Sequence, residues 1–228
     1  MMWNLARRKA GNDVLSMLLF IAVVNVTVYQ FSWVYAGPIT ALSCTAFVTF
    51  LIHRRDINWC DLGLAMPGKK WLLPIQTIVV FTAMGVALFL AYQVVGLFFE
   101  PKETTVSRFG DMEGNLPLYL WWVFLGWVVG GFCEEMLFRG FLLNRVEVML
   151  GGLKSSTVLA IVFQAAVFGI IHFYYQGAFG ALTLFAAAIA IGACYILFGR
   201  KLWPLILSHG ILDTLGFLGD YLGDSAGL

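Results

Sequence analysis

Residues 125–143 read LGWVVGGFCEEMLFRGFLL, a stretch in which three ionisable side chains stand among apolar ones. These side chains are Glu134, Glu135 and Arg139. The stretch is otherwise apolar enough to lie in a membrane, where no water solvates a charge. One ionised side chain at the centre of a membrane helix costs at least about 2.5–3.5 kcal/mol, so such residues are functional candidates by default.

The composition indicates a polytopic membrane protein. Hydrophobic residues make up 61% of the chain and charged residues only 12%, whereas soluble domains are about 25% charged. The 228 residues form one integral-membrane domain, 1–228, and the net charge of +1 gives no reason to expect a nucleic-acid partner. Widely spaced cysteines indicate neither a disulfide framework nor a zinc knuckle; they are Cys44, Cys60, Cys133 and Cys194.

Runs without charged residues predict the membrane spans, because a spanning helix needs about 20 apolar residues. Runs 14–52 and 155–199 are each long enough for two spans, with turns expected near residues 35–38 and 175–177. One span each is expected in runs 71–99, 118–145 and 202–219. The fold class is therefore an all-α polytopic helix bundle of about seven transmembrane helices, or eight if a run is divided differently.

The loop charges orient this bundle. In a seven-span arrangement one side carries most of the basic residues, namely Arg7, Arg8, Lys9, Arg54, Arg55, Lys69, Lys70, Arg145, Lys154, Arg200 and Lys201. The other side receives the segment 100–117, with Glu100, Lys102, Glu103, Arg108, Asp111 and Glu113, and the tail with Asp220 and Asp224. Positive loops mark the cytoplasm, so the N-terminus is expected inside. Compact loops and no organellar signal favour a prokaryotic inner membrane.

The EExxxR segment separates its two glutamates. Glu135 and Arg139 are spaced i,i+4, with the acid on the N-terminal side, the favourable order for an ion pair on one helix face. We expect this pair to be structural. Glu134 has no such partner on its own helix, which suits a general base.

Two further motifs place histidines inside spans. Phe168 and His172 share one helix face, and His209 and Asp213 form an i,i+4 pair that either tightens helix packing or faces a shared cavity. Counted at 1.5 Å per residue, the polar groups lie about 10–22 Å from the cytoplasmic boundary, which allows one site in the cytoplasmic half of the membrane or near its midplane. Gly169 and Gly210, beside the histidines, would allow close helix approach.

Together, EExxxR, FxxxH and HxxxD on successive spans resemble the CAAX protease and bacteriocin-processing (CPBP) family of intramembrane endopeptidases, which includes the type II CAAX prenyl proteases. The resemblance covers about 121–216, within the helices of segment 117–222, whereas segment 1–116 with spans one to three matches only in general character. It implies that Glu134 and His172 activate a water and that His209 and Asp213 face the carbonyl oxygen. Where the prenyl proteases have Asn this chain has Asp213, and an ionised Asp cannot donate to an oxyanion.

The sequence thus predicts a glutamate-type intramembrane endopeptidase acting on a membrane-anchored or lipidated peptide near the cytoplasmic side. Alternatives are a non-catalytic immunity or scaffold protein that binds a peptide in the same cavity, and a transporter with a Glu/His proton relay. No cofactor is expected. If zinc were used, His172, His209 and Asp213 would be its ligands, with Glu134 as the base.

Overall fold

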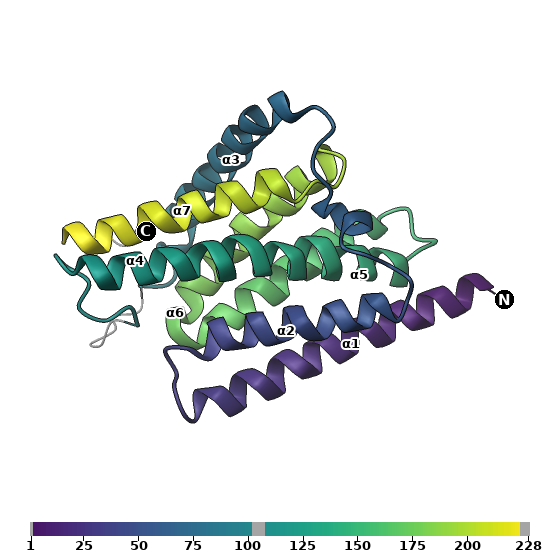
Figure 1. Ribbon diagram of the computed structural model, residues 1–228, viewed down its shortest axis with the longest axis horizontal. Helices are drawn as coiled ribbons and strands as arrows, with labels where there is room; N and C mark the ends of the chain where they lie inside the picture. Colours follow the sequence, from purple (N-terminus) through teal and green to yellow (C-terminus); the bar gives the residue numbers. More distant parts are fainter. Residues whose placement is uncertain (1, 102–107, 224–228) are drawn as a thin grey trace.

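A computed structural model describes residues 2–101 and 108–223, and helices are the only regular structure in this part of the chain. Lys102, Glu103 and Asp224, used above to orient the chain, lie outside the described residues. The long helices are α1 (Met2–Tyr29), α2 (Ala36–His53), α3 (Leu73–Val95), α6 (Ser156–Leu197) and α7 (Trp203–Leu222). A further continuous rod consists of α4 (Leu116–Leu125), η3 (Gly126–Glu134), η4 (Met136–Leu143) and α5 (Asn144–Met149), and the short turns are η1 (Cys60–Leu64) and η2 (Lys70–Leu72). The all-α membrane bundle is confirmed (Figure 1).

Helix α6 is a hairpin of two antiparallel limbs. Gly177, with φ 66° and ψ −164°, has a backbone conformation outside the helical region, and the chain reverses there. The limbs then pack on each other: the Gln164 side chain donates to the Ala188 carbonyl at 2.9 Å. A Cβ at Gly169 would collide with the Ala181 carbonyl oxygen. The break expected near residues 175–177 therefore lies at Gly177.

Five helical segments are long and apolar enough to cross a membrane in the described part of the chain: Trp3–Tyr29, Ala36–His53, Lys70–Val95, Leu116–Met149 and Ser156–Leu197. The last of these contains both limbs of α6, each of about 30 Å. Helix α7 is a sixth long element outside those five. The first turn differs from the expectation, since residues 30–35 connect α1 to α2 and Pro38 lies in the first turn of α2, where its missing N–H costs nothing.

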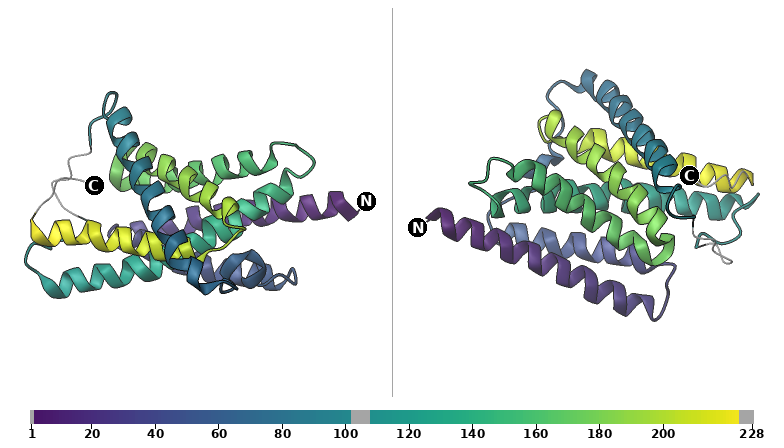
Figure 2. Two further views of the ribbon diagram at one scale, coloured as in Figure 1. Left: turned by 90° about the horizontal axis from the view of Figure 1, so that it is seen from above. Right: turned by 180° about the vertical axis from the view of Figure 1, so that it is seen from behind.

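The basic loops meet at one end of the bundle. Arg7 Nε donates to the Met149 carbonyl, which joins the start of α1 to the end of α5. Arg200, after α6, pairs with Glu147 of α5 at 2.7 Å. The N-terminus lies at this end, and the C-terminal end of α7 lies at the opposite one (Figure 1; Figure 2, left). The charge asymmetry that oriented the chain is thus an asymmetry between the two ends of one structure.

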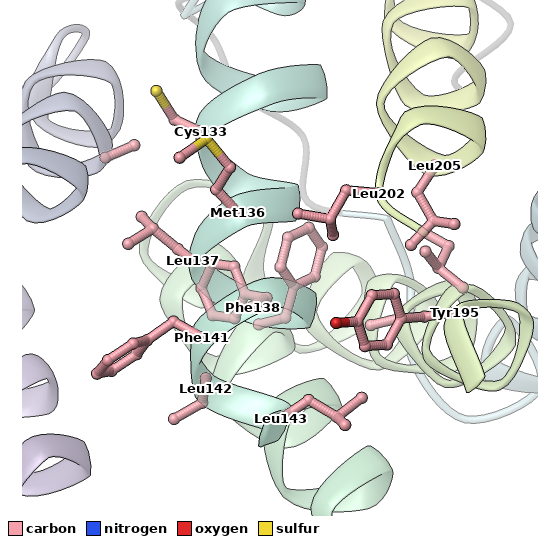
Figure 3. Close-up of a cluster of buried hydrophobic side chains, with 14 of the residues drawn as sticks. Cys133, Met136, Leu137, Phe138, Phe141, Leu142, Leu143, Tyr195, Leu202 and Leu205 are labelled. Atoms are coloured by element: carbon pink, nitrogen blue, oxygen red, sulfur yellow. The ribbon is translucent and has the colours of Figure 1, made fainter. Parts of the chain in front are cut away.

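The rod from α4 to α5 forms the centre of the bundle. Helix α7 packs on η3, α6 packs on η4, and α1 packs on α5, while α3 covers α6 and α7 from outside. Almost every side chain of η4 is buried, and Phe141, Leu142 and Leu143 are 0% exposed. All three belong to one buried apolar cluster. Figure 3 shows Leu143 on the side of the rod that faces Tyr195, Leu202 and Leu205, and Phe141 and Leu142 on the opposite side. A polar side chain on η4, such as that of Arg139, is therefore held away from solvent and lipid.

A backbone latch closes the basic end. Three successive carbonyls of η1 each accept a hydrogen bond from the region where α6 ends and α7 begins. Leu62 accepts from the Tyr195 hydroxyl in the last turn of α6 at 2.9 Å, Gly63 from the Leu202 N–H at 3.0 Å, and Leu64 from the indole of Trp203, the first residue of α7, at 2.8 Å. Gly63 has φ 102°, and a Cβ there would strike the Arg200 carbonyl. The Asp61–Leu64 segment thus has a structural role that requires glycine.

Candidate active site

Three neighbouring elements supply the polar residues singled out by the sequence. Glu134, Glu135 and Arg139 lie on the central rod, at and after the junction of η3 and η4. Both of these segments have π-type hydrogen bonding, a widened helix that occurs frequently at functional sites. The other contributions come from the first limb of α6 and from α7.

Glu135 joins two of these elements. Its Oε1 atom accepts a hydrogen bond from Arg139 Nη1 at 2.9 Å and a second from His209 Nδ1 at 2.8 Å. Glu135 and Arg139 are both 0% exposed, so the i,i+4 ion pair expected from the sequence is fully buried. The contact with His209 was not expected from the sequence. Glu135 therefore neutralises Arg139 and also fixes the orientation of the His209 ring from a different helix.

The aromatic ring of Phe168 lies beside Arg139 and beside both histidines of the site. The Arg139 guanidinium carbon lies 4.9 Å from the centre of its ring. The ring centres of His172 and His209 lie 4.6 and 6.5 Å from that of Phe168. The three motifs of the sequence thus meet at one aromatic ring, which excludes water from the buried ion pair and holds both histidines beside it.

The hydrogen bonding of His172 determines which of its nitrogens is free. His172 Nδ1 lies 2.6 Å from the Phe168 carbonyl oxygen. A carbonyl can only accept, so Nδ1 must carry the proton. In the neutral ring Nε2 then has a free lone pair. His172 is half-buried, which leaves this lone pair available to a small polar molecule.

Asp213 packs against bare backbone on the central rod. A Cβ at Gly130 would collide with Asp213 Oδ2 and lie 3.5 Å from His209 Nε2, and a Cβ at Gly126 would lie 3.0 Å from the Asp213 Cβ. Asp213 Oδ1 lies 3.7 Å from His209 Nε2, which is too long for a hydrogen bond. The pair Gly126 and Gly130 forms a GxxxG motif, which permits close helix approach. The spacing of these two glycines is visible in the sequence and could have indicated this close contact.

Glu134 stands at the edge of the buried network. It is half-buried, and no hydrogen bond joins it to another described side chain. His209 and Asp213 both interact with it electrostatically. Glu134 is thus a carboxylate beside the network but outside its hydrogen bonds, whereas Glu135 accepts two hydrogen bonds through its Oε1 atom.

A cation and an aromatic ring lie beside His172 on the side away from the basic loops. The Arg108 guanidinium carbon is 4.4 Å from the centre of the Tyr175 ring, and the Tyr175 ring centre is 5.6 Å from that of His172. Arg108 Nε also donates to the Val34 carbonyl at 3.1 Å. In the sequence Arg108 is recognisable only as a loop charge, because hydrophobic periodicity does not reveal that its loop folds back onto the helices.

The donor set was also compared with the requirements of a metal ion. In the described ranges, no group of three or more His, Cys, Asp or Glu side chains is arranged to hold one. Nδ1 of each histidine is already engaged, with Phe168 and with Glu135. Because a histidine that ligates a metal commonly donates its other N–H to a carbonyl or a carboxylate, these bonds leave Nε2 of both rings available to a ligand.

Residues 116–215 match the family model described as Type II CAAX prenyl endopeptidase Rce1-like. This match agrees with the family that the three motifs resemble, and it includes every residue of those motifs. No curated protein and no solved structure matches the chain.

Proposed function

Because residues 116–215 match the Rce1-like family model of type II CAAX prenyl endopeptidases, we propose that the protein is a peptidase in which Glu134 and His172 activate a water molecule. The family supports a CAAX-type intramembrane protease in general. The assignment of the catalytic residues is our proposal, and the hydrogen bond from His172 Nδ1 to the Phe168 carbonyl is the observation that carries it.

That hydrogen bond gives His172 one role. With Nδ1–H engaged, Nε2 accepts one hydrogen bond from the water. Glu134, which has no hydrogen-bond partner in the described structure, accepts the other proton of the water and acts as general base. Positioned acid–base groups of this kind contribute typically about 10²–10⁴-fold to the rate.

The attack of water then places negative charge on the carbonyl oxygen. The water oxygen forms a bond to the carbonyl carbon, its proton passes to Glu134, and the carbonyl electron pair moves onto oxygen. His209 stabilises this oxyanion through Nε2–H when both ring nitrogens carry protons, since Nδ1–H already donates to Glu135. One such donor is typically worth about 2.7–4 kcal/mol.

Asp213 has a different role from that of an amide in this step. An ionised carboxylate cannot donate to an oxyanion, but it can balance the positive charge on a doubly protonated His209. Its position 3.7 Å from Nε2 leaves that N–H free to turn toward substrate. When the tetrahedral intermediate collapses, the C–N bond breaks and the amine leaves with the proton held by Glu134.

The proposed substrate is a membrane-anchored or lipidated peptide, because the reacting groups lie within apolar helices. Counted at 1.5 Å per residue, Glu134 is about 22 Å from the end of α5, and His172 is about 24 Å from the start of α6. A peptide bond must therefore enter the bundle to be cut. The proposed mechanism uses no metal.

The test compares two adjacent glutamates. Glu134→Gln should slow cleavage of a membrane-anchored reporter peptide by at least about 100-fold, while the amount of folded protein remains at the wild-type level. Glu135→Gln, which can still accept from His209, should lose folded protein because Arg139 is left unpaired. Full cleavage by a folded Glu134→Gln protein would refute the mechanism, whereas a folded wild-type protein that cleaves no reporter would favour the non-catalytic binding protein or the proton-coupled transporter.

A further inference from the structure

A cationic cavity lies at the basic end of the bundle, remote from the residues described above. Its volume is about 240 Å³, and it opens between the first turns of α1, the segment after α2 and helix α5. Four cations line it, Lys9, Arg54, Arg55 and Arg145, with Asp56 as the one acid of the lining. The proposed peptidase reaction uses none of these residues.

The cavity is built around a buried carboxylate. Asp13, 2% exposed, accepts from Arg55 Nη2 at 2.8 Å and from Arg145 Nη2 at 2.5 Å. These bonds connect α1, the segment after α2 and α5, so the positions of both arginines are fixed. The hydrogen bond to Asp13 raises the pKa of Arg55 above its ordinary value, so Arg55 remains a cation at physiological pH.

The positive charge in the cavity exceeds what its acids neutralise. Asp13 is shared by two arginines, and neither Lys9 nor Arg54 belongs to an ion pair among the described residues. The side chain of Arg145 is 11% exposed, and its Nε is buried without a hydrogen-bond partner in the described structure. A preformed cluster of cations with spare donors suits a phosphate group, whose oxygens accept several charge-assisted hydrogen bonds.

The depth of the cavity matches that of lipid headgroups. Val14 begins the charge-free run of α1, so Asp13 and Lys9 stand where the chain leaves the apolar layer. The preceding turns carry the exposed side chains Trp3 and Leu5, 58% and 53% exposed, and tryptophan is enriched at the membrane–water interface. Helix α1 extends past the other helices at this end (Figures 1 and 2).

We propose that this cavity binds the phosphate of an anionic phospholipid headgroup. Arg55 and Arg145, fixed by Asp13, would form the floor of the site, and Lys9 and Arg54 would close over the phosphate from the exposed side. Basic pockets between membrane helices on the cytoplasmic side are typical headgroup sites. Because the bilayer presents such headgroups at this level, a lipid is favoured over a soluble phosphate.

The test removes the exposed cations and keeps those that hold the fold. Full-length Lys9→Gln/Arg54→Gln protein is purified in detergent and titrated with phosphatidylglycerol, and bound lipid is followed by native mass spectrometry. The control, Lys69→Gln/Lys70→Gln, removes two charges from the same end but outside the cavity. Each basic side chain near an anionic surface is worth about 1 kcal/mol, so binding should weaken about 30-fold in the first variant and stay at the wild-type level in the second.

Three results would overturn the proposal. One is equal weakening in both double variants, which would reflect the overall charge of the basic end. A second is phosphatidylcholine binding as tightly as phosphatidylglycerol, or inorganic phosphate displacing the lipid at equal concentration. The third is unchanged lipid binding with slower cleavage of an acidic reporter peptide in the Lys9→Gln/Arg54→Gln variant, which would assign the cavity to a peptide.

Discussion

Replacing Arg139 by Ala should unfold a large fraction of the protein, because it leaves Glu135 charged in a site with no exposure. Both partners are 0% exposed, and their contact is 2.9 Å. Removing one member of a buried ion pair typically costs about 3–5 kcal/mol. Total stabilities are about 5–15 kcal/mol, so the loss is at least about a fifth of an ordinary protein's stability.

The ion pair itself is expected to contribute little net stability. Arg139 Nε and Nη2 and Glu135 Oε2 are buried without hydrogen-bond partners in the described structure, so desolvation of both ions is incompletely compensated. Replacing both partners by neutral groups is often neutral or stabilising. The double variant Glu135→Gln/Arg139→Met should therefore recover most of the stability that Arg139→Ala loses, since Gln still accepts from His209.

The assay is the yield of monodisperse protein after detergent extraction, together with the midpoint of denaturant unfolding. Glu134→Gln is the matched control, because it changes the neighbouring carboxylate, which makes no hydrogen bond in the described structure. Equal yields and midpoints for Arg139→Ala and Glu134→Gln would refute the reasoning. So would a double variant as unstable as the sum of its single changes, because the two residues would then be uncoupled.

Four further outcomes are expected. Gly130→Ala should push the Asp213 carboxylate aside and lower turnover by up to about 100-fold, because a misplacement of 1 Å can have that effect. Gly85→Ala should leave turnover unchanged, since a Cβ added there meets open space. Equal turnover in both variants would contradict the packing argument. Gly63→Ala should lower the unfolding midpoint, because its φ of 102° and the nearby backbone oppose a side chain; a wild-type midpoint would argue against the latch. Cys60 should react with an impermeant thiol reagent only in opened cells, and labelling in intact cells would reverse the orientation. Activity should survive a strong chelator, whereas loss by chelation and recovery with zinc would require a metal mechanism.

The sequence predicts most of the fold because its signals are local. Span positions follow from runs without charges, and the reversal near Gly177 follows from a run too long for one span. The prediction of an all-α bundle depends on the same local signals, and it is confirmed. Periodicity says less about where a turn falls, and the connection between α1 and α2 lies at residues 30–35 because Pro38 is accommodated inside the first turn of α2.

The residues of the candidate site could be selected from the sequence, but the contacts between them could not. Spacing on one helix predicts the contact of Glu135 with Arg139, since both ends of the pair are on the same face. The hydrogen bond from His209 to Glu135 joins residues 74 positions apart, and no local pattern specifies it. The same holds for Arg108, whose position beside Tyr175 depends on how a loop folds back.

The latch at the basic end has a consequence for synthesis of the chain. The Leu62 carbonyl cannot accept its hydrogen bond until Tyr195, which lies 133 residues later in the chain, has been synthesised. At about 5–20 residues per second, the ribosome needs about 7–27 s to make that stretch. During this interval the first three helices reside in the bilayer with η1 unfastened, and its carbonyls are hydrated because they lie beyond the apolar layer. Closure of the basic end is therefore a late event in biogenesis, and a nascent chain arrested before Tyr195 should be cut by proteases at Leu62 and Gly63, which are buried in the finished protein.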